Sequence, residues 1–463
     1  MISVPHTTPQ RQDVLAAIRE AARRLHIEAY LVGGFVRDRL LGNEGKDIDL
    51  LVVGDGAVEL LDALAEQFDW APPQVFERFG TGQVRGDGYV VESVAARAER
   101  YDPASRKPDV TPGTLEEDVW RRDFTVNALI QTLDGEVLDL TGRGIDDLYA
   151  GVLRTPLDPR ETFSEDPLRM YRAARFVAQL GFTLAPGVLD AMRDMAPRAA
   201  ILSVERVSEE VRRLLVSPHP RAGIEVLRES GLLQVHLAEL LDMIGVEQSG
   251  YHVYDVYQHT MVAVEHAPAD LLTRVAVLLH DVGKPPTHAV APDGRHTFHD
   301  HPEVGAKIAE NMLQRLRFGN NEIDDVTALI RMHLRPIQYD PSTFSDAAVR
   351  RLMRDAGDLR GRLLDVARAD TRASAFPDTH GIDELEQRMA QLDAESDGRP
   401  NPFDSPLDGD EIMAMAGGRR PGPWVGAAKR ALSDAVVEGE VAPGDRLAAR
   451  AWLLAHPELL EAP

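Results

Sequence analysis

The first 150 residues alternate short apolar runs with helical patterns of hydrophobic positions and glycine-bearing turns. Alternating or continuous apolar residues predict strands at residues 29–32, 47–53, 88–94 and 136–140. Segments with apolar residues at helical spacing lie between these strands. The pattern therefore predicts a mixed α/β unit over residues 1–150.

Beyond residue 150 the hydrophobic period becomes helical. EDPLRMYRAARFVAQL (165–180) and SVERVSEEVRRLLV (203–216) are typical, and alternating patterns almost disappear. This predicts a long all-helical region. PTHAVAPDGRHTFHD (286–300) indicates a loop within one helical module, and SDGRPNPFDSPLDGDE (396–411) indicates a boundary before a small C-terminal module.

Composition narrows the classes of function. A chain of 463 residues with 44% hydrophobic content favours two to four domains. The absence of cysteine excludes disulfides, thiolate metal sites and cysteine nucleophiles. The formal charge is −24, from 51 basic and 75 acidic residues, so any nucleic-acid partner must be bound by a local basic surface.

Neither a secretion signal nor a membrane span is expected. The first 20 residues lack the compact apolar core of a signal peptide. No apolar run approaches the roughly 18 residues that would indicate a membrane span. We therefore expect a cytoplasmic protein with no membrane partner.

The stretch YLVGGFVRDRLLGNEGKDIDLLVVG (30–54) carries the first candidate site. Asp47 and Asp49 are two apart on a predicted strand, so both carboxylates project from one face and suit Mg²⁺. Gly33 and Gly34 precede a helical pattern, so a helix N-terminus could bind a triphosphate. The alternative is an ordinary turn beside a solvated aspartate pair.

A third carboxylate is expected if two metals assist an in-line displacement at phosphate. Glu92 is the candidate, on a predicted strand where Val90 and Val94 share its face. An acidic group on such a face is costly unless it is paired. A solvated sheet face is the alternative interpretation.

These motifs, followed by LEEDVWRRDFTVNAL (115–129) and EDPLRMYRAARF (165–176), resemble the class II tRNA nucleotidyltransferases, which comprise CCA-, CC- and A-adding enzymes and bacterial poly(A) polymerases. The resemblance covers roughly residues 25–215. It implies an α+β fold with a polymerase-β-like head on a mixed sheet, then all-helical neck, body and tail. It makes Gly33 and Gly34 triphosphate contacts and Asp47 and Asp49 metal ligands. The candidate nucleotide-binding residues from the head are Arg37, Arg122, Asp123 and Asn127.

The segment EDPLRMYRAARF (165–176) contains residues that could recognise the base of the incoming nucleotide. Cytosine and adenine each present an amino donor beside a ring-nitrogen acceptor, so Asp166 could accept from the amino group while Arg169 donates to the ring nitrogen. Three residues apart, they are expected on one helix face. The alternative is a surface ion pair. Arg172 and Arg175 either hold the incoming phosphate and primer end or neutralise the acidic helix start.

A second constellation lies within about residues 250–375. Its order, a His, then His-Asp, two further His and a final Asp, resembles the HD phosphohydrolases, with Lys284 as a possible aid to phosphate binding. Imidazoles and carboxylates in such numbers suit a transition metal, here Mn²⁺, Ni²⁺ or Co²⁺. We expect His252, His266, His288 and His296 to be ordinary solvated histidines. The candidate ligands are His259, His280, Asp281, His301, His333 and Asp370.

Together these patterns predict a head (1–150), a neck that recognises the base (151–215), a body with the HD domain (216–390) and a helical tail (391–463). The leading hypothesis is a CCA- or CC-adding enzyme that uses CTP, ATP and tRNA, with an HD module that removes phosphate or opens a 2′,3′-cyclic phosphate at damaged ends. The alternatives are an A-adding enzyme, a poly(A) polymerase and an HD phosphohydrolase or RNA-binding adaptor with an inactive head. The segment 101–118, with Arg106, Lys107 and Asp109, resembles the head loop that helps decide whether A follows CC. The sequence leaves that choice and the oligomeric state open.

Overall fold

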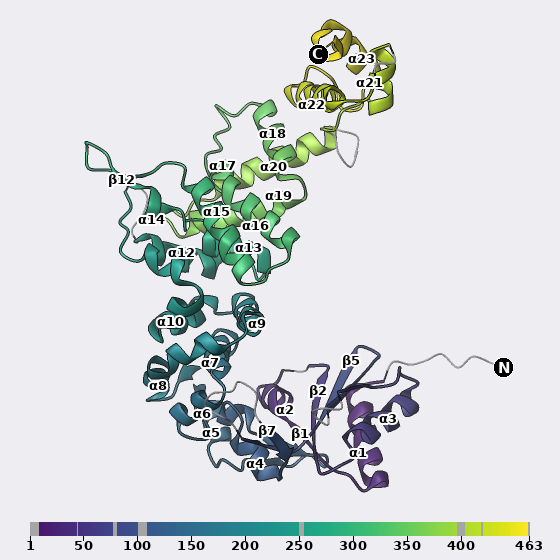
Figure 1. Cartoon of the computed structure of the whole chain (residues 1–463), viewed down its shortest axis with the longest axis vertical. Helices are drawn as coiled ribbons and strands as arrows, with labels where there is room; N and C mark the ends of the chain where they lie inside the picture. The colour runs from purple at the N-terminus through teal and green to yellow at the C-terminus, as the bar shows by residue number, and fades with distance from the viewer. Residues whose placement is uncertain are drawn as a thin grey trace, which may run out of the picture. The chain divides into compact units, whose positions relative to one another are not determined.

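The computed structural model of the chain describes residues 9–43, 45–76, 81–100, 109–249, 254–395, 403–417 and 420–461. The chain forms two compact units, Met1–Ala238 and Glu239–Pro463. Figure 1 shows strands concentrated in the first unit and helices throughout the second.

The first unit is built on a seven-stranded sheet with the order β3-β4-β5-β2-β1-β8-β9. Strands β2 and β5 are parallel, whereas the other neighbours are antiparallel, so the sheet is mixed. Helix α3 (Ala57–Phe68) packs on β4 and β5 and also contacts α1 (Arg11–Leu25). The strands are β1 (Glu28–Val32), β2 (Asp47–Val53), β3 (Gln74–Phe76), β4 (Thr81–Gly86), β5 (Tyr89–Ala95), β8 (Ile130–Thr132) and β9 (Val137–Leu138).

The remainder of this unit is mainly helical. Helix α7 (Leu168–Leu180) has ten buried residues and packs against α9 (Val204–Leu215) and α10 (Pro220–Glu229). Short strand pairs are β6 (Arg97–Arg100) with β7 (Asp109–Pro112), and β10 (Val152–Leu153) with β11 (Thr183–Leu184). The helices are α2 (Gly33–Leu40), α4 (Leu115–Trp120), the 3₁₀ turn η2 (Thr125–Asn127), α5 (Gly144–Ala150), α6 (Pro159–Glu165), α7 (Leu168–Leu180), α8 (Val188–Met195), η3 (Ala196–Ile201), α9 (Val204–Leu215), α10 (Pro220–Glu229) and α11 (Leu232–His236).

The second unit is helical apart from one hairpin, β12 (His288–Val290) with β13 (His296–Phe298), within its described residues. Helices α12, α13, α16 and α19 pack together. The last helices, α21 to α24, share a separate core that includes Leu407, Trp424 and Leu432. The elements are η4 (Ala238–Met243), α12 (Val256–His266), α13 (Leu271–Leu279), α14 (Lys284–Thr287), α15 (His301–Arg315), α16 (Asn320–Met332), α17 (Leu334–Ile337), α18 (Asp346–Ala356), η5 (Gly357–Leu359), α19 (Arg360–Arg372), α20 (His380–Glu395), α21 (Gly409–Met415), α22 (Pro423–Glu438), α23 (Arg446–Ala455) and α24 (Glu458–Glu461).

The expected mixed head sheet followed by a helical chain is confirmed, and all four predicted strands are present as β1, β2, β5 and β9. The segment 286–300, expected to be a loop, instead forms the β12–β13 hairpin. Of the segment 101–118, residues 101–108 lie outside the described residues. The finer domain boundaries stay a prediction. Within the described ranges, no helix combines the length and apolar content needed to cross a membrane.

Candidate active sites

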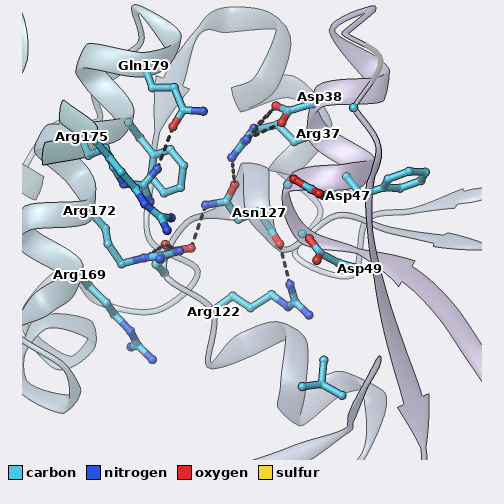
Figure 2. A pocket seen from close by; sticks show the side chains of 18 of the residues that line it. Arg37, Asp38, Asp47, Asp49, Arg122, Asn127, Arg169, Arg172, Arg175 and Gln179 are labelled. Carbon is cyan, nitrogen blue, oxygen red and sulfur yellow. Dashed lines mark hydrogen bonds and ion pairs between the residues drawn. The ribbon is translucent and has the colours of Figure 1, made fainter. Parts of the chain in front are cut away.

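A cavity of about 800 Å³ opens beside the head sheet, between β2, α2 and helices α7 and α9. Figure 2 shows Arg169, Arg172 and Arg175 of α7 on one side of it and Asp47 and Asp49 on the other. Of the described residues, ten arginines and five aspartates line it, and none of the described lysines does. The strongly acidic chain therefore contains the local basic surface that a nucleic-acid or triphosphate ligand requires.

The glycine pair forms the first residues of α2, directly after β1. Gly33 has φ +65°, and a Cβ there would lie 3.3 Å from an Arg122 nitrogen and 3.7 Å from Asp49 Oδ2. Only glycine combines that backbone conformation with such close neighbours. The first amides of a helix have no intrahelical acceptor, so this end of α2 can donate to phosphate oxygens.

Asp47 and Asp49 project from β2 into the cavity, as the alternation predicted. Burial raises the pKa of Asp49 to about 6, with Glu92 and Asp47 adding to the rise while Arg122 and Arg37 oppose it. The crowding of negative charge at Asp49 fits a divalent metal bound by these carboxylates.

Glu92 lies opposite Asp49 on the parallel strand β5, so the third carboxylate is near the first two. Of its two predicted environments, the structure has the solvated sheet face. Glu92 is exposed, and only Asp47 and Asp49 of the three carboxylates are among the described residues that line the cavity. Its face of β5 is open, so the residue needs no compensating partner.

Arg37 and Arg122 of the head donate to nearby acceptors, of which Asn127 and Asp118 are buried. Arg37 donates to Asn127 Oδ1 at 2.6 Å and to the Asp38 carboxylate at 2.8 and 3.0 Å. Arg122 donates to the Asn127 carbonyl oxygen at 3.1 Å and to Asp118 Oδ2 at 2.9 Å. Asn127 thus positions both guanidinium groups. Asp118 was not predicted as a site residue, because in the sequence it belongs to a run of acidic residues typical of a helix start, and only the structure shows that its carboxylate is fully buried.

Asp123 connects the head to α7. Its carboxylate accepts from Asn127 Nδ2 at 3.0 Å and from Arg172 Nε at 2.7 Å. Burial would raise the pKa of Asp123, but the charge of Arg172 and the hydrogen bonds from Asn127 and Arg172 lower it to about 2. Asp123 is therefore a structural anchor in this geometry, and it also lines the cavity.

The structure corrects the expected geometry of Asp166 and Arg169. Asp166 lies between α6 and α7 and not within a helix. Its Oδ1 accepts a hydrogen bond from the Leu168 amide at the start of α7, so its side chain helps that helix to begin. It pairs with Arg206, whose nitrogen lies 2.9 Å from Oδ2, while Arg169 pairs with Glu165 at 2.8 Å. Both side chains still line the same cavity.

Arg172 and Arg175 line the cavity while engaged in internal ion pairs. Arg172 binds Asp123, and Arg175 donates to Glu210 Oε2 at 2.5 Å. These contacts show what holds the two side chains in place.

Five of the cavity arginines were not among the predicted site residues: Arg11, Arg97, Arg121, Arg206 and Arg213. Arg206 and Arg213 lie seven residues apart on α9, and Arg11 on α1 lies over the Phe35 ring at 4.7 Å. The spacing of Arg206 and Arg213 is a signal present in the sequence, since residues seven apart share a helix face. Arg11 carries no comparable pattern.

The second unit brings all six candidate metal ligands together. The side-chain atoms of His259, His280 and Asp370 lie within 4.8 Å of one another, and so do those of Asp281, His301 and His333. The two sets adjoin, since His280 Nε2 is 3.2 Å from Asp281 Oδ2 and 3.8 Å from Asp370 Oδ1. They come from α12, α15 and α19 and from the C-terminal ends of α13 and α16.

Backbone carbonyls orient three of these histidines. Nδ1 of His280, His301 and His333 contacts the carbonyl oxygen three residues earlier, at 2.7, 2.9 and 2.7 Å. Because a carbonyl only accepts, Nδ1 is the donor and Nε2 faces the cluster. These Nε2 atoms and both Asp281 oxygens are buried without a hydrogen bond of good geometry among the described residues, which fits a bound metal.

Electrostatics at the cluster also favour a cation. Burial lowers the pKa of His280, but Asp281 and Asp370 raise it to about 9. Burial, with a contribution from His280, lowers the pKa of His333 to about 4, so that ring is neutral, which is the form that a metal ligand requires. Lys284 is buried, and its Nζ atom lies 2.7 Å from Asp281 Oδ2 and donates to Gln248 Oε1. Its ammonium group is therefore paired with a candidate metal ligand and does not face solvent.

Family models match three parts of the chain. Residues 29–154 match the poly(A) polymerase head domain, and residues 181–244 match a probable RNA- and SrmB-binding site of polymerase A. Residues 250–374 match the HD domain. The last match contains all six candidate ligands of the second unit.

Similarity to known proteins covers most of the chain. The chain is 35% identical to the A-adding tRNA nucleotidyltransferase of Deinococcus radiodurans, covering 89% of this chain and 92% of that protein. It is 34% identical to the CC-adding tRNA nucleotidyltransferase of Thermus thermophilus, covering 92% and 93%. The crystal structure of the Bacillus stearothermophilus CCA-adding enzyme in complex with CTP is 25% identical, with a TM-score of 0.69 and 98% of each chain covered.

The head motifs, the cavity beside the mixed sheet and these similarities agree on one assignment. The chain belongs to the class II tRNA nucleotidyltransferases and carries an HD domain.

Proposed function

We propose that the protein adds C residues, with or without the final A, to the 3′ end of tRNA, using CTP and ATP. The observation that carries this proposal is one cavity in which the Asp47–Asp49 pair faces the arginines of α7. The relatives divide between A addition and CC addition, so family membership supports the reaction class and leaves the number of nucleotides to experiment.

Different residues of the cavity would bind the metal and the triphosphate. Asp47 and Asp49 would hold Mg²⁺, which supplies positive charge to the phosphates during displacement. The N-terminus of α2 and the fixed guanidinium groups of Arg37 and Arg122 would bind the triphosphate. Arginines line the cavity at fixed positions, which favours positioning and electrostatic stabilisation as the source of catalysis.

Asp166 and Arg169 would select the base. Asp166 retains acceptor capacity, because a carboxylate oxygen that takes one hydrogen bond has a second lone pair. It can therefore accept from the amino group of C or A while Arg169 donates to the ring nitrogen. Uracil and guanine present the opposite pattern and would leave these groups unpaired, which supplies discrimination.

The direct test offers the purified protein Mg²⁺, CTP and ATP with one tRNA that ends at the discriminator base and one that ends in CC. Growth of the first tRNA by three nucleotides indicates CCA addition, and by two indicates CC addition. Growth of the second tRNA alone, by one nucleotide, indicates A addition, and long A tails support a poly(A) polymerase. Asp49→Ala should abolish every extension; retained extension would disprove the metal assignment.

A second activity is proposed for the HD domain, because six candidate ligands converge there and the buried Nε2 atoms of His280, His301 and His333 have no hydrogen bond of good geometry among the described residues. We propose that His259, His280, Asp281, His301, His333 and Asp370 hold Mn²⁺, Ni²⁺ or Co²⁺, which activates water for attack on a phosphoester. The substrate would be a phosphate or 2′,3′-cyclic phosphate at a damaged tRNA 3′ end. Its removal restores the hydroxyl that nucleotide addition needs.

The two activities can be separated by mutation. Asp281→Ala should abolish phosphate release from such ends and leave nucleotide addition intact, and Asp49→Ala should do the reverse. The assay uses 3′-phosphorylated and 2′,3′-cyclic tRNA with each metal in turn. If wild-type protein releases no phosphate with any of them, the hydrolase proposal is wrong while the nucleotidyltransferase proposal stands.

A further inference from the structure

The β12–β13 hairpin carries aromatic and imidazole rings on one face. His288 lies opposite Phe298 and Val290 lies opposite His296, so these four side chains share that face. His288 and Val290 are exposed, and Val290 retains 59% of its accessible surface. In Figure 1 the hairpin extends beyond the helices of its own unit. The ring-bearing face is therefore not part of a hydrophobic core.

Two of these rings form one flat surface. His288 Nε2 and His296 Nδ1 are hydrogen-bonded at 2.7 Å, with ring centroids 5.0 Å apart and planes only 7° apart. A hydrogen bond between ring nitrogens runs in the plane of the rings, so the imidazoles lie edge to edge. The Phe298 ring stacks against His288, with ring centroids 5.4 Å apart and planes inclined by 25°.

The same hairpin adjoins the metal-ligand cluster. The Phe298 carbonyl oxygen accepts from His301 Nδ1 at 2.9 Å, so the residue that stacks against His288 also orients a candidate ligand. The Lys284 Nζ atom lies 5.5 Å from the Phe298 ring centroid and 2.7 Å from Asp281 Oδ2. A ligand lying on the rings would thus be a near neighbour of the phosphoester site.

We infer that this surface, formed by His288 and His296 and supported by the stacked Phe298 ring, is a stacking platform for the base of the RNA 3′-terminal nucleotide whose phosphate the HD centre removes. Bases of single-stranded ends stack on aromatic and histidine side chains, and stacking accepts any base. Sequence-tolerant binding suits a repair activity that must accept whichever nucleotide ends a damaged tRNA. The inference deepens the proposed HD function and rests on it for the identity of the phosphate.

The test uses the full-length protein and a short RNA that ends in 2-aminopurine and a 3′-phosphate. Stacking quenches 2-aminopurine fluorescence, so wild-type protein should bind this RNA with quenching. His288→Ala should weaken binding about tenfold and relieve the quenching, whereas His288→Phe should retain both because it keeps a flat ring. His380→Ala, which removes an exposed histidine on α20, is the matched control and should behave as wild type.

Phosphate release gives the second readout. The ratio of kcat/KM for this RNA to that for glycerol 2-phosphate, which has no base, should fall about tenfold in His288→Ala, mainly through KM. Equal quenching and an equal ratio in wild type and His288→Ala would overturn the platform, as would a His288→Phe variant that behaves like His288→Ala. If wild type releases no phosphate from either substrate but His288→Ala still loses the quenching, the platform stands and the hydrolase proposal fails.

Discussion

At the scale of single residues, Gly33 is the position where the backbone of the cavity is most constrained. A Gly33→Ala side chain would force a φ of +65° on a non-glycine residue, which costs about 1–2 kcal/mol. Its Cβ would also lie 3.3 Å from an Arg122 nitrogen, which is closer than an ordinary contact, so this side chain would have to shift. We expect a lower unfolding free energy and a fall of about tenfold or more in kcat/KM for nucleotide addition.

Gly142 provides the control for that change. It has the same φ of +65°, but a Cβ there would meet nothing within 4 Å. Gly142→Ala should therefore cost similar stability in urea unfolding and leave nucleotide addition unchanged. If both variants lose activity equally, the close approach at Gly33 has no role in binding the triphosphate.

The buried carboxylate of Asp123 predicts a specific pH dependence. Its pKa falls from 3.8 to about 2 in the folded protein. A depressed pKa means that the stabilisation is complete above pH 4 and is lost as the pH falls towards 2, and it amounts to about 2 kcal/mol. Asp123→Asn should therefore be less stable than wild type at pH 7, and the difference should close at low pH.

Urea unfolding between pH 7 and pH 3 measures this difference, with the exposed Asp134 as the reference position. Asp134 pairs with Arg23 on the surface, where both side chains are about two-thirds exposed, so Asp134→Asn should change stability little at any pH. A gap between wild type and Asp123→Asn that stays constant with pH would contradict the assignment of the lowered pKa to the Arg172 pair.

The candidate residues that sequence predicted well are those whose geometry is local. Strand alternation placed Asp47 and Asp49 together, and the helical pattern after a strand located Gly33. The order of histidines and aspartates identified the second cluster through resemblance. Arg206 escaped prediction because its contact with Asp166 joins residues 40 apart, and no periodic pattern specifies such a pair.

At the scale of elements, strand β4 shows how tertiary packing overrides local propensity. Its sequence, TGQVRG, carries two glycines and little alternation, so it was not predicted. In the structure a Cβ at Gly86 would lie 2.1 Å from the Trp70 ring, and one at Gly82 would lie 2.7 Å from Leu61. Glycine is required because these side chains approach the strand closely, a constraint that exists only in the folded sheet.

The packing of α7 against α9 depends on a buried ion pair. Arg175 and Glu210 are each 7% exposed, and removing the carboxylate would leave the guanidinium charge buried without its partner. Glu210→Ala should therefore lower the unfolding free energy by about 3 kcal/mol or more. The neighbouring Glu209 pairs with Arg213 on the surface, so Glu209→Ala should cost less than about 1 kcal/mol.

Chemical denaturation of the two glutamate variants gives the comparison directly, because they differ by one position on the same helix. Equal losses would show that the Arg175–Glu210 pair contributes no more than a surface pair. A loss confined to Glu210→Ala would confirm that the arginine wall of the cavity depends on acidic partners beneath it.

At the scale of the whole molecule, a chain with a net charge of −24 concentrates ten of its described arginines around one cavity. Much of the positive charge in the cavity is held by nearby carboxylates, as at Arg122, Arg172 and Arg175. The acidic remainder of the surface disfavours nonspecific adhesion to nucleic acid. Binding is thereby concentrated at a site whose geometry is fixed, which suits addition of a few defined nucleotides better than tailing of arbitrary RNA.

Because the candidate transition-metal ligands all lie in the second compact unit, we expect such a metal to stabilise that unit alone. In excess Mg²⁺, which saturates Asp47 and Asp49, added Ni²⁺ should stabilise the unit Glu239–Pro463 by about 2.7 kcal/mol at 100 times its Kd, because it binds the folded cluster alone. Hydrogen exchange should slow in α13, α16 and α19, which carry or adjoin the ligands, and not in β1 or β2. His333→Ala should abolish the effect, since it removes a buried Nε2 of the cluster, and the exposed His380→Ala should retain it. Protection that spreads equally to the head sheet, or that survives His333→Ala, would show that the metal binds elsewhere.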